Sequence, residues 1–188
     1  GGYAVITQNL ASFNFQYPGV TAVQWSAGRL DGNGETLRIT TSTYGLGILD
    51  FRYEGNWYPE TRTGASLEIV DPDAARTSWS DQASWQPSAP SPGGPPPFGV
   101  LAPADVIVTL PRPAILGAWV SPGPHAVGDI TLAWRKVSGP GSVVFTAPAN
   151  KVTDAAFSQP GIYELSITAT PPGGGPEATD TVIVTAAE

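Results

Sequence analysis

The sequence predicts an all-β protein of two sandwich modules joined by a linker rich in proline and glycine. Short runs of Val, Ile, Thr and aromatic residues recur along the chain and are broken by Gly, Pro, Asn and Asp, a pattern typical of strands separated by turns. Gln86–Pro97 holds six prolines and two glycines and is predicted to be a semi-rigid spacer. We therefore expect a first module at 1–86, a linker at 87–102 and a second module at 103–188.

The first half contains five predicted strands and two predicted helical turns. The strands are expected at Tyr3–Thr7, Thr21–Trp25, Thr36–Thr40, Ile48–Tyr53 and Ser66–Val70. One helical turn is expected at Ala11–Tyr17 and another at Asp73–Ser78, with Asp71 as its N-cap. Asp31–Gly34 reads Asp-Gly-Asn-Gly and predicts a tight turn, because Gly and Asn accept positive φ.

The second half is more regular. Its strands are expected at Asp105–Leu110, Ala118–Val120, Ile130–Val137, Val143–Phe145, Ala155–Phe157, Ile162–Thr170 and Thr179–Thr185. Within Ile162–Thr170, apolar residues alternate with polar ones, which predicts a half-buried antiparallel strand. Seven short strands in this length are typical of an immunoglobulin-like sandwich.

The composition excludes several classes of function. The 188 residues carry a net charge of −7 and the nine basic residues are scattered, so no basic stripe is available to bind nucleic acid. With no cysteine and one histidine, His125, the chain excludes disulfides, thiolate metal sites and sites that need two imidazoles. No apolar run approaches the ~18–20 residues that span a bilayer. The absence of methionine indicates a processed product or a fragment.

Three strings in the second half carry a resemblance. Residues 132–141 read LAWRKVSGPG, residues 159–165 read QPGIYEL and residues 178–182 read ATDTV. From about residue 103 to its end, the chain resembles the PKD-type (polycystic-kidney-disease-type) immunoglobulin-like repeat of secreted and surface proteins. The resemblance implies that Trp134 is the core tryptophan. Tyr163 follows a Pro-Gly corner, where its ring can pack and its hydroxyl can reach the backbone.

The first half resembles a different domain. Residues 1–6 read GGYAVI, residues 28–37 read GRLDGNGETL, and residues 64–69 read GASLEI. These strings are similar to the bacterial lamin-tail domain, another immunoglobulin-like sandwich, although Asn33 stands where that family has a second glycine. In that family the Gly-Gly-Tyr string lies in the middle of the domain. The resemblance therefore implies that earlier strands are missing and that the first sandwich is incomplete.

An incomplete sandwich leaves a groove that another strand must fill. The expected lining is Val5, Leu37, Ile39, Phe51 and Leu67. Either Gly1–Thr7 or Thr179–Ala187 of a neighbouring subunit has a suitable alternation to fill it. Because head-to-tail donation of a strand does not close on itself, it would build a filament.

One acidic pattern resembles the start of a calcium loop. Asp31, Asn33 and Glu35 place three oxygen ligands at alternating positions, but the distal bidentate Glu of an EF-hand is absent. Turn chemistry explains the same residues. We predict no cofactor, with weak calcium binding at this turn as the alternative.

A second pattern contains the residue types of a glycosidase site. Glu54 and Glu60 flank Trp57 and Tyr58, which gives two carboxylates and an aromatic platform. A loop with solvated acids and packing aromatics is the simpler interpretation, since nothing in the sequence raises a carboxyl pKa there. We therefore predict that the chain has no catalytic residue and is not an enzyme.

The aromatic residues of the first half are candidates for a ligand site or an interface. Trp57, Tyr58, Trp79 and Trp85 crowd this half together with Trp25. Exposed rings in a row would bind a polysaccharide, whereas buried rings would fill small cores or cover strand edges.

These observations predict a non-catalytic structural or adhesive protein located outside the cell. Low charge and many Thr, Gly and Pro residues suit an extracellular polymer or stalk, and the open first module favours association of copies through strand edges. The specific version is a self-assembling subunit of a surface filament. The alternatives are an accessory or carbohydrate-binding region of a larger secreted enzyme, and a plain spacer fragment.

Overall fold

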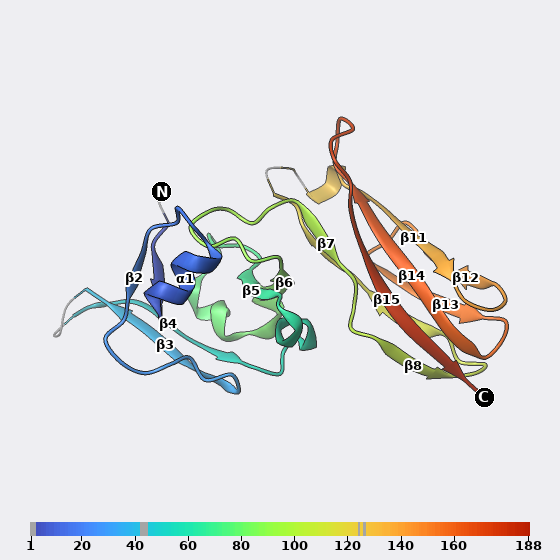
Figure 1. The fold of residues 1–188 in the computed structure, drawn as a ribbon, viewed down its shortest axis with the longest axis horizontal. Coiled ribbons are helices and arrows are strands. Elements are labelled where there is room, and N and C mark those ends of the chain that lie inside the picture. Colours follow the sequence, from blue (N-terminus) through green and yellow to red (C-terminus); the bar gives the residue numbers. More distant parts are fainter. Residues whose placement is uncertain (1–2, 42–44, 124, 126) are drawn as a thin grey trace.

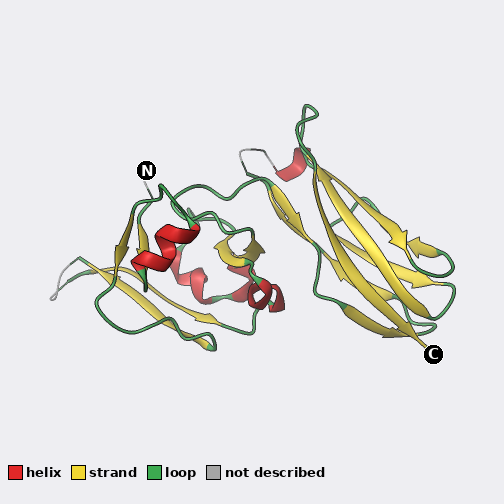
Figure 2. Cartoon of the chain, in the orientation of Figure 1, coloured by secondary structure: helices red, strands yellow, loops and turns green. Residues whose placement is uncertain are grey.

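The computed structural model describes residues 3–41, 45–123, 125 and 127–188, and it confirms an all-β chain. Two parts follow each other along the long axis, and the strands of the second part are visibly longer (Figure 1). Most of the helical turns lie in the first part, whereas the second part is almost entirely strand and loop (Figure 2).

The second part is a two-layered sandwich, as predicted. One sheet has the strand order β11-β14-β15-β8 and the other the order β12-β13-β9. Antiparallel pairing holds throughout these sheets, except that β15 runs parallel to β8. The strands are β8 (Val106–Thr109), β9 (Ala114–Gly117), β11 (Thr131–Ser138), β12 (Val143–Phe145), β13 (Val152–Phe157), β14 (Gly161–Thr170) and β15 (Ala178–Ala187).

The core of this sandwich has the two aromatic residues where the sequence places them. Trp134 in β11 is buried, and its indole N–H donates to the carbonyl of Asn150 at 3.0 Å. Tyr163 in β14 is fully buried, packs on Phe157 at 4.7 Å between ring centroids, and donates its hydroxyl to the carbonyl of Gln159 at 2.7 Å. Both polar ends are thus satisfied inside the core, which removes the cost of burying them.

Two glycines, one in the Ser-Gly-Pro-Gly string at 138–141 and one in the Gln-Pro-Gly string at 159–161, have no room for a side chain. Gly139 has a φ of +119°, and a Cβ there would lie 2.6 Å from Cδ1 of Tyr163. Gly161 has a φ of +146°, and a Cβ there would lie 2.5 Å from a ring carbon of Pro140. A side chain at either position would combine an unfavourable backbone conformation with a clash. The two strings therefore pack against each other at the corner where β14 begins.

The predicted linker takes part in strand pairing at both ends. Pro87 and Ser88 end β6 (Trp85–Ser88), and Pro87 is fully buried opposite Leu67. At the other end, β7 (Gly99–Leu101) pairs antiparallel with β10 (Trp119–Ser121). Val100 and Ala102 belong to the buried core of the second part. The linker prediction missed these contacts because proline removes a donor but does not prevent pairing at a strand edge.

The first part consists of three two-stranded sheets and short helices. Its strands are β1 (Val5–Thr7), β2 (Ala22–Gln24), β3 (Gly34–Thr40), β4 (Gly47–Glu54), β5 (Ser66–Ile69) and β6. They pair as β1-β2, β3-β4 and β5-β6, and among the described residues they do not close a second sandwich. The helical segments are α1 (Leu10–Gln16) and the 3-10 turns Pro59–Thr63, Arg76–Ser80 and Gln82–Ser84.

The predicted helical turns are confirmed in part. Helix α1 lies where Ala11–Tyr17 was expected, and the Asn9 side chain caps it by accepting from the Ser12 N–H at 3.0 Å. Asp71 does not cap a helix, because its carboxylate accepts from the Asp73 N–H at 2.9 Å within a turn and the next 3-10 helix begins at Arg76.

The first part has almost no core. Leaving proline aside, the described residues have seventeen buried aliphatic and aromatic side chains, of which sixteen form the cluster of the second part and the remaining one is Phe51. Val5, Leu37 and Leu67 are half-buried, and Ile39 is 44% exposed. Of the five residues expected to line an open groove, Phe51 is therefore buried, Ile39 is exposed and the other three are partly shielded.

Candidate functional site

The calcium candidates are held by the bonds of a turn. The Asp31 carboxylate accepts from the Asn33 backbone N–H at 2.9 Å, and Glu35 Oε1 accepts from the Asp31 N–H at 2.9 Å. Tyr53 donates its hydroxyl to the carbonyl of Asp31 at 2.7 Å, and burial, together with the charge of Glu35, raises its pKa. The described residues hold no group of three or more His, Asp or Glu side chains arranged for a metal ion. Weak calcium binding at this turn remains the untested alternative to the prediction of no cofactor.

Glu54 and Glu60 line different cavities, so the described structure does not form the carboxylate pair of a glycosidase. Glu54 accepts from Arg52 Nε at 2.6 Å, and this contact raises the pKa of the guanidinium. Glu60 is buried where the two parts meet, and its Oε1 accepts from the Ala104 N–H at 3.0 Å. Glu54 borders the cavity beside Trp57, whereas Glu60 borders the cavity between the two parts, so the two acids do not face a common cavity.

Two of the four candidate aromatics make up a small core of the first part. Trp85 stacks on Phe51 with ring centroids 5.2 Å apart, and Trp79 meets both rings edge-on at 5.8 and 6.0 Å. The Trp85 indole N–H donates to the Trp79 carbonyl at 2.6 Å. These rings face one another, so they act as packing residues in this arrangement.

Tyr58 joins the two parts of the chain. Its ring lies edge-on to Trp119 of β10 at 5.8 Å, and its hydroxyl donates to the carbonyls of Trp85 at 2.8 Å and Gln82 at 3.0 Å. Burial is the main cause that raises the pKa of Tyr58. Tyr58 is thus an interface aromatic within the chain.

Trp57 is half-buried and borders a cavity of about 360 Å³. Tyr53, Glu54 and Asp31 line the same cavity. An aromatic face beside carboxylates is an arrangement that a sugar ring can use, because its C–H groups pack on the aromatic face while its hydroxyls donate to the acids. Trp57 is therefore the candidate aromatic whose surroundings fit a ligand.

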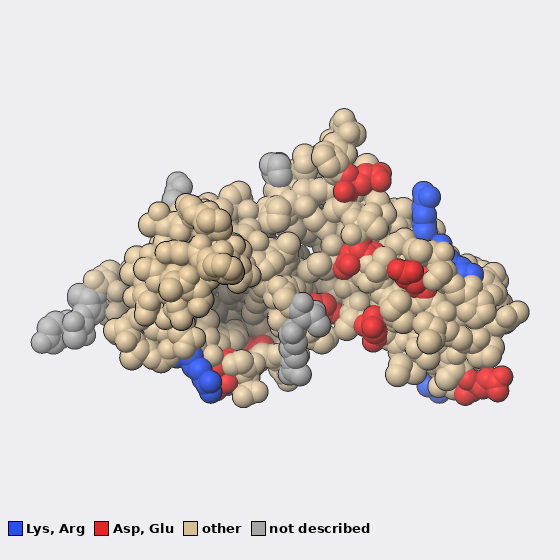
Figure 3. Space-filling model, viewed as in Figure 1, with Lys and Arg blue, Asp and Glu red and all other residues tan. Residues whose placement is uncertain are grey.

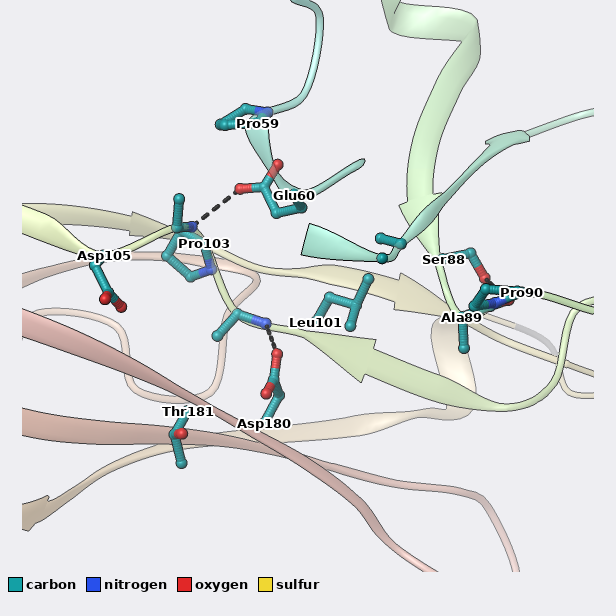
Figure 4. A pocket seen from close by; sticks show the side chains of 14 residues that line it. Pro59, Glu60, Ser88, Ala89, Pro90, Leu101, Pro103, Asp105, Asp180 and Thr181 are labelled. Carbon is teal, nitrogen blue, oxygen red and sulfur yellow. Dashed lines mark hydrogen bonds between the residues drawn. The ribbon is translucent and has the colours of Figure 1, made fainter. Parts of the chain in front are cut away.

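A cavity of about 530 Å³ lies between the two parts, and three acidic residues border it. Besides the Glu60 contact, Asp180 accepts from the Ala102 N–H at 2.8 Å, as Figure 4 shows. Asp105 accepts from the Ile183 N–H at 3.0 Å. Each carboxylate holds backbone near the start of the sandwich, which gives this acidic cluster a structural role.

A second cavity of about 530 Å³ runs along β5, and sequence reasoning missed it. Tyr3, Tyr17 and Glu68 border it together with residues of the proline-rich segment. Burial raises the pKa of the Glu68 carboxyl, while hydrogen bonds from Ser88 and Gln86 act in the opposite direction. No local sequence pattern indicates this cavity, because it forms only when the proline-rich segment folds back over β5. We call this cavity the β5 groove.

Charge is absent from the first segment of the chain. Residues 3–28 hold no Asp, Glu, Lys or Arg, and Arg29 is the first charged residue. The face over α1 accordingly shows neither acidic nor basic side chains (Figure 3). Large apolar side chains are exposed there, including Phe15 at 92% and Val23 at 67%.

No helix in the described residues is long and apolar enough to cross a membrane.

Comparisons with known proteins found similarity among solved structures. A scan against protein-family models found no match, and neither did a search of curated proteins. The PKD domain of the KIAA 1837 protein matches with a TM-score of 0.36 and 22% identity, covering 54% of this chain and 92% of that chain. The PKD domain of human KIAA0319 matches with a TM-score of 0.35 and 20% identity, covering 54% and 94%.

The M3 domain of titin is also similar, with a TM-score of 0.33 and 16% identity, covering 48% of this chain and 95% of that one. The strand order and register given above are the basis of the sandwich assignment. The lamin-tail resemblance of the first half remains a prediction.

Proposed function

We propose that this chain is a non-catalytic structural or adhesive protein of the extracellular space, in which copies associate through the first part. The observation that carries the proposal is the contrast in burial: leaving proline aside, the described residues have one buried apolar side chain before residue 98 and sixteen after it. Full burial of one such side chain is worth about 1.5–3 kcal/mol. A first part with so little burial gains most from covering its apolar surface with another chain.

The specific form of the proposal is a filament subunit. Each two-stranded sheet of the first part has open edges, and an open edge is a template for another strand. If one copy supplies the strand and the next one accepts it, the contact is head-to-tail and propagates. A chain built this way needs no catalytic residue.

Self-association of the full chain tests the proposal. Sedimentation velocity over a series of concentrations should show a mass that rises with concentration, and electron microscopy of concentrated protein should show linear assemblies. A chain that remains monomeric at every concentration while its first part stays folded by circular dichroism would contradict the proposal and leave the spacer interpretation.

The cavity beside Trp57 favours a second function, binding of a polysaccharide by an accessory region of a larger secreted enzyme. Binding to insoluble and soluble glycans should then fall for Trp57→Ala and be unaffected by Phe15→Ala, which removes an exposed ring away from the cavity. Equal binding by both variants and the parent chain, or no binding at all, counts against this second function.

A further inference from the structure

The outer edge of β5 is open. Among the described residues β5 pairs with β6 alone, in antiparallel register. The Val70 N–H donates to the Ser84 carbonyl at 2.9 Å and continues that register. Because groups that face the partner alternate along an antiparallel strand, Ser66 and Glu68 share the orientation of Val70 toward β6. The N–H and C=O groups of Leu67 and Ile69 therefore point away from β6.

The β5 groove runs along the whole of this strand. All residues from Ser66 to Val70 line it, and Ser88 of β6 borders it as well. The rest of its wall consists of Tyr3, Tyr17 and residues of the proline-rich segment, most of them prolines. Proline has no N–H, so this wall offers apolar surface rather than a competing strand. A guest in the groove would find main-chain hydrogen-bonding groups on β5 and apolar contact on the facing wall, which are the two requirements of strand addition.

The charge of the groove limits what can enter it from a second copy. Glu68 is the one charged residue among the described lining residues, and its Oε2 is buried without a hydrogen-bond partner. The chain as a whole carries a net charge of −7. A segment with acidic residues would therefore be disfavoured in the groove, whereas an uncharged segment adds no repulsion to that between the two chains. Residues 3–28 form such an uncharged segment.

Two segments were expected to serve as donors of the added strand, and the structure favours one of them over the other. Thr179–Ala187 lies within β15, which is paired on both sides, so its donation would dismantle the sandwich. The Gly1–Thr7 segment falls partly outside the described residues, but its described part is weakly held. In that part β1 makes a parallel pairing of three residues with β2, and Tyr3 and Ile6 are 64% and 55% exposed.

We propose that the β5 groove accepts the Tyr3–Thr7 segment of a second copy as an added strand on the open edge of β5. The segment is uncharged, apolar and extended, and Tyr3 already borders the groove of its own chain, so donor and acceptor surfaces are continuous. This inference rests on the proposed association of copies and names the surfaces that carry it.

Cross-linking between two single-cysteine variants tests the contact, since the chain has no cysteine of its own. Ile6→Cys and Val70→Cys, both at exposed positions, are mixed and treated with a short bismaleimide. The matched control mixes Ile6→Cys with Ile115→Cys, whose site on β9 is 72% exposed. We expect at least about tenfold more mixed dimer from the first mixture, because a bound pair holds its thiols at a millimolar effective concentration.

A second variant tests the hydrogen-bonding edge. Leu67→Pro removes an N–H that points away from β6, whereas Leu67→Ala truncates the same side chain and keeps that N–H. Strand addition predicts that Leu67→Pro weakens association about tenfold more than Leu67→Ala does, which corresponds to the loss of about one hydrogen bond. The cross-linking result stands independently if Leu67→Pro fails to fold.

The outcomes separate this inference from the proposed function. If copies associate but the Ile6–Val70 mixture gives no more cross-link than its control, the groove assignment is wrong and the association proposal stands. Cross-linking of Val70→Cys to itself, without cross-linking to Ile6→Cys, would indicate a symmetric contact and would also overturn the assignment. A chain that is monomeric throughout overturns both.

Discussion

Tyr163 shows how one residue combines apolar and polar requirements in the sandwich. Its ring fills the core, while its hydroxyl reaches back four residues to the Gln159 carbonyl. The Pro-Gly corner before β14 makes this possible, because it turns the chain so that carbonyl and hydroxyl meet at 2.7 Å. Sequence alone anticipated both the ring and the hydroxyl contact, since a Tyr after Pro-Gly has few other ways to satisfy a buried O–H.

Replacing Tyr163 with Phe should destabilise the sandwich modestly. The ring stays buried, but the Gln159 carbonyl loses its donor, which lowers the free energy of unfolding by about 1 kcal/mol. Urea unfolding followed by circular dichroism measures this change. Tyr3→Phe is the control, because Tyr3 is exposed and the same atom is removed. Equal stability of Tyr163→Phe and the parent chain would show that this hydrogen bond contributes nothing.

Glu68 makes the stability of the first part depend on pH. Burial raises the pKa of this carboxyl above its ordinary value of 4.5, so the folded chain binds a proton more readily than the unfolded chain does. The stabilising effect of this proton is present at low pH and is lost as the pH rises through the folded-state pKa. Glu68→Gln should therefore be more stable than the parent at pH 7, with a smaller difference below the ordinary pKa. Tryptophan fluorescence during urea unfolding at both pH values measures it, and an unchanged difference would contradict the assignment.

At the scale of elements, periodicity predicted the long strands well and the short ones less well. β12 lies at its predicted bounds, and β14 and β15 each extend their predicted range by a residue or two. β6, β7 and β9 were missed, because they are short and lie in or beside proline-containing sequence. Their pairing depends on partners far along the chain, which no local pattern specifies. The same applies to the β5 groove, whose lining residues come from four separate stretches of the chain.

β7 provides a direct test of where the sandwich begins. A fragment 98–188 keeps β7 and the core residues Val100 and Ala102, whereas a fragment 103–188 lacks them. We expect the longer fragment to unfold cooperatively and to be more stable by several kcal/mol, since burying one Val side chain alone is worth about 1.5–3 kcal/mol. Thermal and urea unfolding of the pair measure the difference. Equal stability would place the boundary at 103, as the sequence predicted.

At the scale of the whole molecule, the two parts differ in how much of their structure the sequence specifies. The second part has a complete core and a resemblance whose aromatic positions the structure confirms. The first part was expected to form an incomplete sandwich, and its described residues instead form three small sheets with one cluster of rings, Phe51, Trp79 and Trp85. Without a core of its own, a segment has few mutually supporting contacts, so its local sequence pattern does not determine how its strands pair.

This difference predicts two unfolding transitions in the full chain. The first part should unfold at lower urea concentration, because it buries far less apolar surface. Trp134→Ala should lower the free energy of unfolding of the second transition by about 3–5 kcal/mol and leave the first unchanged. Trp79→Ala is the matched control and should affect the first transition. One shared transition that moves with either substitution would show that the parts fold as a unit.

The pairing of β8 with β15 has a mechanical consequence for a chain under tension. The two strands run parallel, with Val106 opposite Val184 and Thr109 opposite Ala187. Tension that enters before β8 and leaves after β15 pulls these strands in opposite directions along their own axes. Their hydrogen bonds then lie across the pulling direction and bear the load together, so they must rupture at once rather than one after another. The sandwich would thereby resist stretching, a property that a subunit of the proposed filament would need.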